Sequence, residues 1–192
     1  MSVLSEVNSV KVWDPLVRVF HWTLFSAFIL ALATGDDWAR PHAVAGYVMG
    51  VLIAVRLVWG LIGTRHARFS DFVRGPRAVR KYLAELLSGS APRVLGHNPA
   101  GGAMIVLLLI MLMLTVVSGL ALEATESARG PLAGVIPAGH FWKEFYEEGH
   151  EVIANFTLFL VLIHVSAVIL SSWLHGENLI RAMITGRKAK EL

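Results

Sequence analysis

Four apolar stretches constrain this sequence more than any other feature. A helix needs roughly 20 apolar residues to cross a hydrocarbon layer of about 30 Å. Stretches of this kind predict spans at 17–35, 43–63, 102–122 and 150–173, and only the second carries a charge in its interior, Arg56. We therefore expect an all-α integral membrane protein: a single membrane domain, 1–192, folded as a four-transmembrane-helix bundle.

The composition agrees with this fold class and removes several kinds of site. Of the 192 residues, 55% are hydrophobic and 16% are charged, which is more apolar than a typical soluble domain. The sequence has no cysteine, so it excludes disulfides, iron–sulfur clusters, thiolate zinc sites and covalently attached c-type haem. Polar residues, Lys11 and Asp14, precede the first apolar stretch, and we read that stretch as a retained transmembrane helix.

The charges between the spans predict how the chain is oriented. The segment 64–101 holds seven basic and two acidic residues, whereas 123–149 holds five acidic and two basic residues. Because basic loops stay in the cytoplasm, we predict a bacterial inner-membrane protein with both termini cytoplasmic and 123–149 outside. The net charge of +3 thus reflects membrane orientation, and we expect membrane lipid and no nucleic acid as a partner.

A short amphipathic helix is expected inside the basic segment. The sequence "PRAVRKYLAELLSG" begins at Pro76, places leucines at helical spacing and ends at Gly89. Such a helix can lie on an anionic inner leaflet or serve as a solvated connector, and the sequence leaves both open.

Four histidines lie at the ends or inside of the predicted spans. His150 and His164 are fourteen residues apart, about 3.9 helical turns, so they share one face at two depths. His42 lies at the outer depth with His150, and His21 lies at the inner depth with His164. The other histidines fall in loops or at span ends, where a surface role is the default: His66, His97, His140 and His175.

Two pairs of imidazoles on facing helices favour haem. Zinc requires four ligands, whereas haem iron needs two axial nitrogens and its flat macrocycle fits between helices. We predict two bis-histidine haems b. Gly46 and Gly50, on the face of His42, would let a porphyrin approach the backbone, although close helix packing also explains them. A cofactor-free protein with histidine proton relays is an alternative that leaves the pairing unexplained.

Arg56 lies fourteen residues after His42, at the depth of the inner haem. A guanidinium is a planar, permanently charged partner for a carboxylate, so we assign Arg56 to a propionate of that haem. Snorkelling to the membrane interface is the competing explanation.

The residues around these histidines resemble a known family. The segments "DPLVRVFHW", "HAVAGYVMGVLIAVRLVWG", "GHNPAGGAMIVLLLIMLM" and "HEVIANFTLFLVLIHVSAVI" are similar to the bacterial di-haem membrane cytochromes b, of cytochrome b561 type, that include the b-type subunit of nickel–iron hydrogenases. The resemblance extends from Val12 to about Gly186. It implies a four-helix bundle with one haem bound by His42 and His150 and another by His21 and His164, which agrees with the depth argument.

The resemblance also implies electron transfer between the quinone pool and a periplasmic redox partner, a hydrogenase or a c-type cytochrome. Hydrogenase subunits often have an additional span, so four spans favour the cytochrome partner or a stand-alone role. A quinone is also expected, and the segment around His140, Trp142 and Lys143 is a candidate pocket, with interfacial anchoring by Phe141 and Trp142 as the alternative.

A related function, superoxide oxidation coupled to quinone reduction, is the alternative. Such an enzyme should present a positive funnel to its anionic substrate. The predicted outer segment is acidic, which argues against this function and would suit a basic c-type cytochrome.

Overall fold

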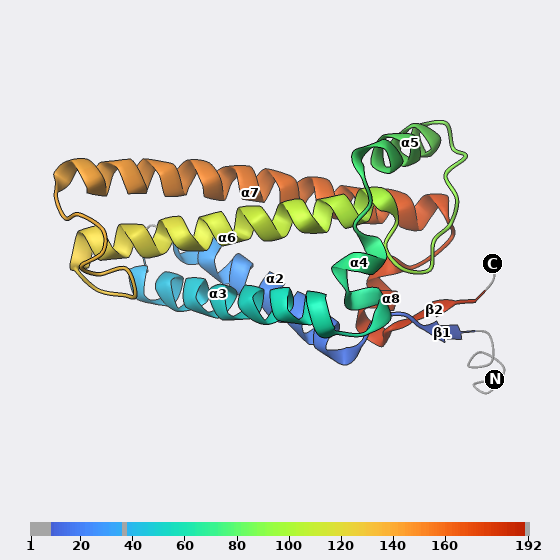
Figure 1. Ribbon diagram of the computed structural model, residues 1–192, viewed down its shortest axis with the longest axis horizontal. Coiled ribbons are helices and arrows are strands. Elements are labelled where there is room, and N and C mark those ends of the chain that lie inside the picture. Colours follow the sequence, from blue (N-terminus) through green and yellow to red (C-terminus); the bar gives the residue numbers. More distant parts are fainter. Residues whose placement is uncertain (1–8, 36–37, 191–192) are drawn as a thin grey trace. The chain divides into compact units, whose positions relative to one another are not determined.

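The computed structural model describes residues 9–35 and 38–190. In chain order the elements are β1 Ser9–Lys11, α2 Pro15–Thr34, α3 Ala39–Ile62, η1 Arg65–Ala67, α4 Phe69–Phe72, α5 Pro76–Leu87, α6 Pro99–Ser127, α7 His140–Leu174, α8 Leu179–Thr185 and β2 Arg187–Ala189 (Figure 1).

Helices α2, α3, α6 and α7 are each long and apolar enough to cross a membrane. The prediction of an all-α protein with four transmembrane helices is therefore confirmed. Each helix extends beyond at least one end of its predicted span, and the largest difference is in α7, which begins ten residues before the predicted span at 150. These ten residues are polar and aromatic, so hydropathy alone does not include them in the span although they continue the helix. Asp36, which ends the first uncharged stretch, lies outside the described residues.

The chain divides into two compact units, and each long helix contributes to both. The first unit comprises, among the described residues, 9–22, 55–107 and 163–190; the second comprises 23–35, 38–54 and 108–162. The first unit contains His21, Arg56 and His164, and the second contains His42 and His150. Each unit thus holds one of the predicted histidine pairs. That the chain forms a single membrane domain stays a prediction.

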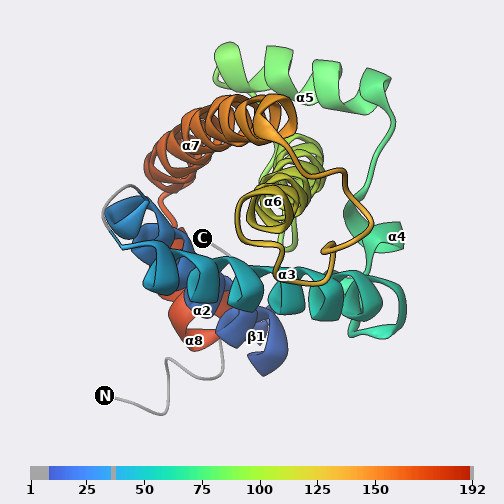
Figure 2. The same ribbon diagram turned by 90° about the vertical axis from the view of Figure 1, so that its left-hand side faces the viewer.

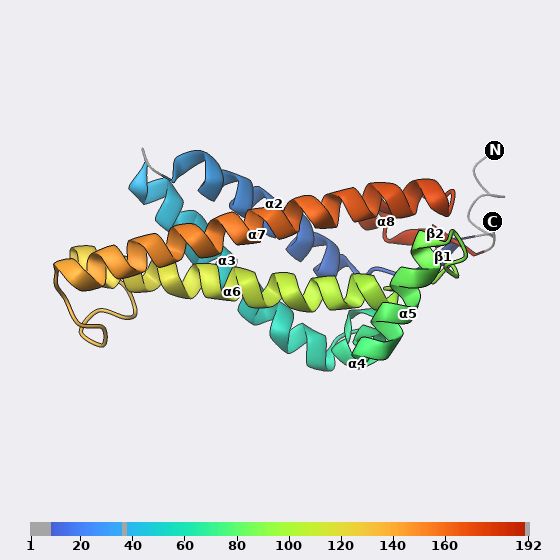
Figure 3. The ribbon, with the colours of Figure 1, turned by 90° about the horizontal axis from the view of Figure 1, so that it is seen from above.

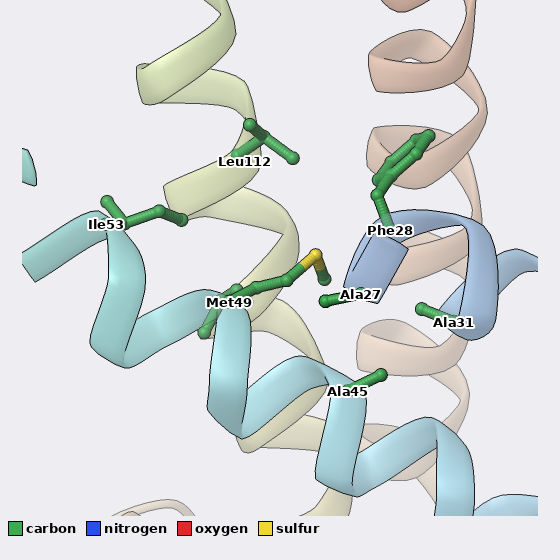
Figure 4. Close-up of a cluster of buried hydrophobic side chains, with 8 residues drawn as sticks. Ala27, Phe28, Ala31, Ala45, Met49, Ile53 and Leu112 are labelled. Carbon is green, nitrogen blue, oxygen red and sulfur yellow. The ribbon is translucent and has the colours of Figure 1, made fainter. Parts of the chain in front are cut away.

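The core of the second unit combines small and large side chains. Ala27, Ala31 and Ala45 are buried beside Phe28 and Met49, because small residues let apolar helices approach closely (Figure 4). Ile53, Leu112 and Val116 complete this cluster. Figure 2 shows the chain turning from α6 to α7 through the segment between them.

Asp14 organises the start of α2 in the first unit. Its Oδ1 accepts a hydrogen bond of 2.9 Å from the amide of Val17, which caps the helix directly before Pro15. Its Oδ2 accepts from Trp59 Nε1 at 3.1 Å and from the hydroxyl of Thr64. One buried carboxylate therefore fixes the beginning of α2 against the end of α3.

The C-terminal segment is tied to the same unit. β2 pairs with β1 in antiparallel register, Ser9 opposite Ala189, next to α8 (Figures 1 and 3). Glu177, whose side chain is 8% exposed, pairs with Arg93 and, at 3.2 Å, with Lys188 Nζ. The expected amphipathic helix is α5, which starts at Pro76 and is followed by Gly89 at a φ of 71°.

Candidate functional site

His42 and His150 come together in the second unit. Their ring centroids are 6.0 Å apart and their planes are inclined by 83°. A metal–imidazole bond is about 2 Å long, and the ring centre lies about 1 Å beyond the nitrogen, so two axial imidazoles have centroids roughly 6 Å apart. The separation therefore matches that of two ligands on opposite sides of one metal ion.

The tautomer of His42 follows from its hydrogen bond. Its Nδ1 lies 2.9 Å from the carbonyl oxygen of Ala31. A carbonyl can only accept, so Nδ1 carries the proton. The lone pair of the ring is then on Nε2, which is free to bind a metal.

The tautomer of His150 follows by one more step. Its Nδ1 lies 2.9 Å from Ser118 Oγ, and that hydroxyl donates its own proton to the carbonyl of Thr115 at 3.0 Å. Ser118 must therefore accept from His150, which again places the proton on Nδ1 and the lone pair on Nε2. Both rings of this pair are oriented in the way that metal-ligating histidines usually are.

Three glycines lie around this pair, and one of them, Gly46, has open space beside it. A Cβ at Gly46 would meet no heavy atom within 4 Å, so open space lies beside the helix there. A Cβ at Gly50 would lie 3.2 Å from Val116, so Gly50 serves helix packing. Gly119 is a further close approach, because a Cβ there would lie 3.0 Å from the ring of His150.

His21 and His164 form the pair of the first unit. The two rings are near enough to interact electrostatically, and His21 Nδ1 is buried without a hydrogen-bond partner. A buried polar nitrogen without a partner is costly, so a ligand that engages this ring would remove an unfavourable feature.

Arg56 is buried in the same unit, with 3% of its surface exposed. Its guanidinium carbon lies 5.2 Å from the ring centre of Phe69 and 6.0 Å from that of Phe72. One terminal nitrogen is buried without a hydrogen-bond partner, and no carboxylate among residues 9–35 and 38–190 forms an ion pair with it. The side chain is thus enclosed by aromatic rings, which suits an anion-binding role better than snorkelling.

The segment predicted as a quinone pocket forms the start of α7. His140 pairs with Glu144 at 3.1 Å, and Lys143 pairs with Glu126 at 2.9 Å. The ring of Trp142 contacts those of Phe141, Phe145 and Tyr146. His140 and Lys143 are therefore each paired with a carboxylate, and the quinone pocket stays a prediction.

Several residues of the sites were missed in the sequence. Ser118 and Gly119 interrupt an apolar stretch, and this small polar pair was the available signal. The Ala31 carbonyl has no sequence signal, because any residue supplies a carbonyl. The default expectation for His97 is a surface role, yet its Nδ1 is buried without a partner.

These residues fit haem b. The rings of His42 and His150 lie 6.0 Å apart between centroids, Gly46 leaves space beside them, and His21 and Arg56 present buried nitrogens without partners. No group of three or more His, Asp or Glu residues that could hold a metal ion by themselves occurs in the described part of the chain. The donor set suits an iron whose other four ligands come from a macrocycle.

Comparison with known proteins agrees with this chemistry. The sequence model of the family "Prokaryotic cytochrome b561" matches residues 12–186. The chain is 24% identical to the "Probable Ni/Fe-hydrogenase B-type cytochrome subunit" of Rhodobacter capsulatus, over 94% of this chain and 82% of the relative.

Proteins of the same description from two other bacteria match over similar shares. That of Cupriavidus necator is 22% identical, over 94% of this chain and 87% of its own length, and that of Azotobacter vinelandii is 24% identical, over 93% and 88%. No solved structure matches the chain significantly. These matches agree with the four membrane helices and the paired histidines. The chain therefore belongs to the prokaryotic cytochrome b561 family and is a b-type membrane cytochrome of electron transport.

Proposed function

We propose that this protein is a di-haem electron-transfer subunit. His42 and His150 bind one haem b, and His21 and His164 bind the second. The observation that carries this proposal is the His42–His150 pair, with ring centroids 6.0 Å apart and both Nδ1 protons assigned. When bound, haem supplies a one-electron redox centre, and the protein determines its ligands, its surroundings and its access to solvent.

Each part of the second-unit site has a definite role in this proposal. The Ala31 carbonyl and Ser118 hold the Nδ1 protons, so each ring would keep its Nε2 lone pair available to bind haem iron. Gly46 gives the macrocycle room against α3. In the first unit, Arg56 supplies a fixed positive charge for a haem propionate, and such a charge favours ferrous over ferric haem.

The proposed electron path joins the quinone pool to a partner protein. The names of the relatives support a nickel–iron hydrogenase as that partner. A c-type cytochrome stays a prediction that rests on the acidic segment 123–149. The basic segment 64–101 supports an inner-membrane location with cytoplasmic termini.

Haem content and spectra of the purified protein test this proposal. We expect two haems b per chain by pyridine haemochrome, and two bis-histidine components in oxidised-minus-reduced spectra. His164→Ala should retain one haem. His175→Ala is the control, since the ring of that histidine bonds to backbone carbonyls, with Nδ1 3.0 Å from Ser171 and Nε2 3.4 Å from Ala91, and it should retain both haems.

Two results would refute the haem proposal: a purified protein without haem, or an unchanged haem content in His164→Ala. The electron path is tested separately. Addition of quinol to membranes should reduce both haems, and a haem-loaded protein that quinol does not reduce would exclude the quinone pool as its electron donor.

A further inference from the structure

His97, in the same unit as Arg56, is a second polar residue with a buried nitrogen. The ring of His97 contacts two aromatic side chains, with its centroid 4.4 Å from that of Trp13 and 4.7 Å from that of Phe72. Phe72 is the same ring that lies 6.0 Å from the Arg56 guanidinium carbon. His97 and Arg56 therefore border one aromatic side chain, which is itself only 1% exposed.

Both groups have buried nitrogens without partners. His97 Nδ1 and one terminal nitrogen of Arg56 are enclosed and accept or donate no hydrogen bond. Most buried polar atoms in proteins have a partner, and a buried charge without one is especially costly. The two nitrogens without partners, both beside Phe72, indicate a binding site for a ligand that forms hydrogen bonds with them.

The carboxylate that affects Arg56 electrostatically is already committed. Asp14 accepts hydrogen bonds from the amide of Val17, from Trp59 and from Thr64, and it forms no ion pair with Arg56. Lys188, whose positive charge also acts on His97, is paired with Glu177. The missing component is therefore a single acceptor group with negative charge.

A carboxylate is the chemical group that suits these donors. A guanidinium offers its planar N–H fork to two oxygens, and a neutral imidazole donates one N–H. Burial lowers the pKa of His97 to about 3, and the positive charges of Arg56 and Lys188 act in the same direction. The ring is therefore neutral at pH 7, and its contribution is a hydrogen bond, whereas Arg56 contributes the charge.

We propose that His97 and Arg56 together bind one carboxylate, and that this carboxylate is a propionate of the haem held by His21 and His164. The inference rests on the proposed function, because it requires haem in the first unit. It adds His97 as a positioning residue, which fixes the propionate and through it the orientation of the macrocycle.

Resonance Raman spectroscopy of the holoprotein tests this assignment. The bending band of a haem propionate shifts when its hydrogen bonds are lost. In the His150→Ala background, which should contain only the first-unit haem, we expect His97→Phe to retain that haem and to shift the band to lower frequency. The reduction potential should also fall, because a less neutralised propionate favours ferric iron.

Two further variants keep the test decisive. Phenylalanine preserves the ring packing against Trp13 and Phe72, and His97→Gln restores an N–H donor and should restore the band. His175→Phe is the matched control, because the ring nitrogens of that histidine already bond to the carbonyls of Ser171 and Ala91, and it should leave the band unchanged. An unshifted band in haem-loaded His97→Phe would refute the role of His97. A purified parent protein without haem would instead refute the proposed function.

A second arm separates the propionate from a free anion. Acetate is titrated into the holoprotein, and the melting temperature is followed. Stabilisation by acetate that is abolished in His97→Phe, together with an unshifted band in the holoprotein, would show a site for a free carboxylate and overturn the propionate assignment. With propionate as the ligand, the holoprotein should show the band shift and no added stability from acetate.

Discussion

The two histidine pairs of this protein differ in what holds their rings. In the second unit, His42 and His150 each donate Nδ1–H to a protein acceptor, the Ala31 carbonyl and Ser118. In the first unit, His21 Nδ1 is buried without a partner, and Arg56 and His97 are likewise incompletely bonded. One pair is fixed by the polypeptide itself, whereas the other depends more on its ligand. A protein can therefore organise two chemically similar sites by different means.

Substitution of one histidine in each pair should have the largest effect and tests whether the two sites are independent. We expect His150→Ala to lose the second-unit haem and His164→Ala to lose the first-unit haem, because in the proposed function each pair supplies both protein ligands of its haem. Pyridine haemochrome should give one haem per chain in either variant. Their reduced spectra should differ and should add up to that of the parent protein. Loss of both haems from either variant would show that the sites are not independent.

Asp14 should be a strong contributor to the stability of the first unit. Asp14→Ala removes a helix cap and leaves Trp59 Nε1 and the Thr64 hydroxyl without their acceptor. The free energy of unfolding should fall by roughly 2–4 kcal/mol. Denaturant unfolding in detergent measures it. A change below about 0.5 kcal/mol would show that these bonds contribute little.

Asp14 also predicts a dependence of stability on pH. Burial opposes its ionisation, but hydrogen bonds from Thr64, Val17 and Trp59 outweigh burial and lower the pKa of Asp14 below its usual value. Its stabilisation is then complete above about pH 4 and is lost as the pH falls through the folded-state pKa. Asp14→Asn should melt at a lower temperature than the parent at pH 7, and the difference should narrow toward pH 3. A constant difference would contradict the lowered pKa.

Substitution of Ser118 tests how much its hydrogen bond contributes to the His42–His150 pair. Ser118→Ala removes the acceptor of His150 Nδ1–H, so the affinity for the second-unit haem should fall about tenfold and its reduction potential should rise. Haem dissociation rates and a redox titration measure these effects. Ser127→Ala is the control, because its hydroxyl bonds only to its own helix, at the Glu123 carbonyl. Equal changes in both haems would contradict a local role.

Gly46 gives the smallest and most specific test. A methyl group there meets no atom of the polypeptide within 4 Å, so Gly46→Ala should leave the stability of the haem-free protein unchanged. The substitution should lower the affinity for the second-unit haem a few-fold only when a macrocycle lies against α3. Gly50→Ala is the contrast, since its methyl group meets Val116 at 3.2 Å and should affect the haem-free protein itself. Unchanged haem binding in Gly46→Ala would place the macrocycle elsewhere.

The sequence by itself determined the four membrane helices, the short helix at Pro76 and the candidate pairing of four histidines. Apolar length and the helical repeat are local properties, so counting along one helix is enough to place residues on one face. The family followed from the same segments, and the match over residues 12–186 confirms it.

Only the tertiary structure decided which groups meet these side chains. The acceptors of His42 and His150 come from neighbouring helices, and their identity depends on how those helices are rotated against one another. The enclosure of Arg56 and His97 by Phe72 depends on a loop and a short helix far from both in sequence. Such contacts join distant parts of the chain, and no local pattern of hydropathy or spacing specifies them.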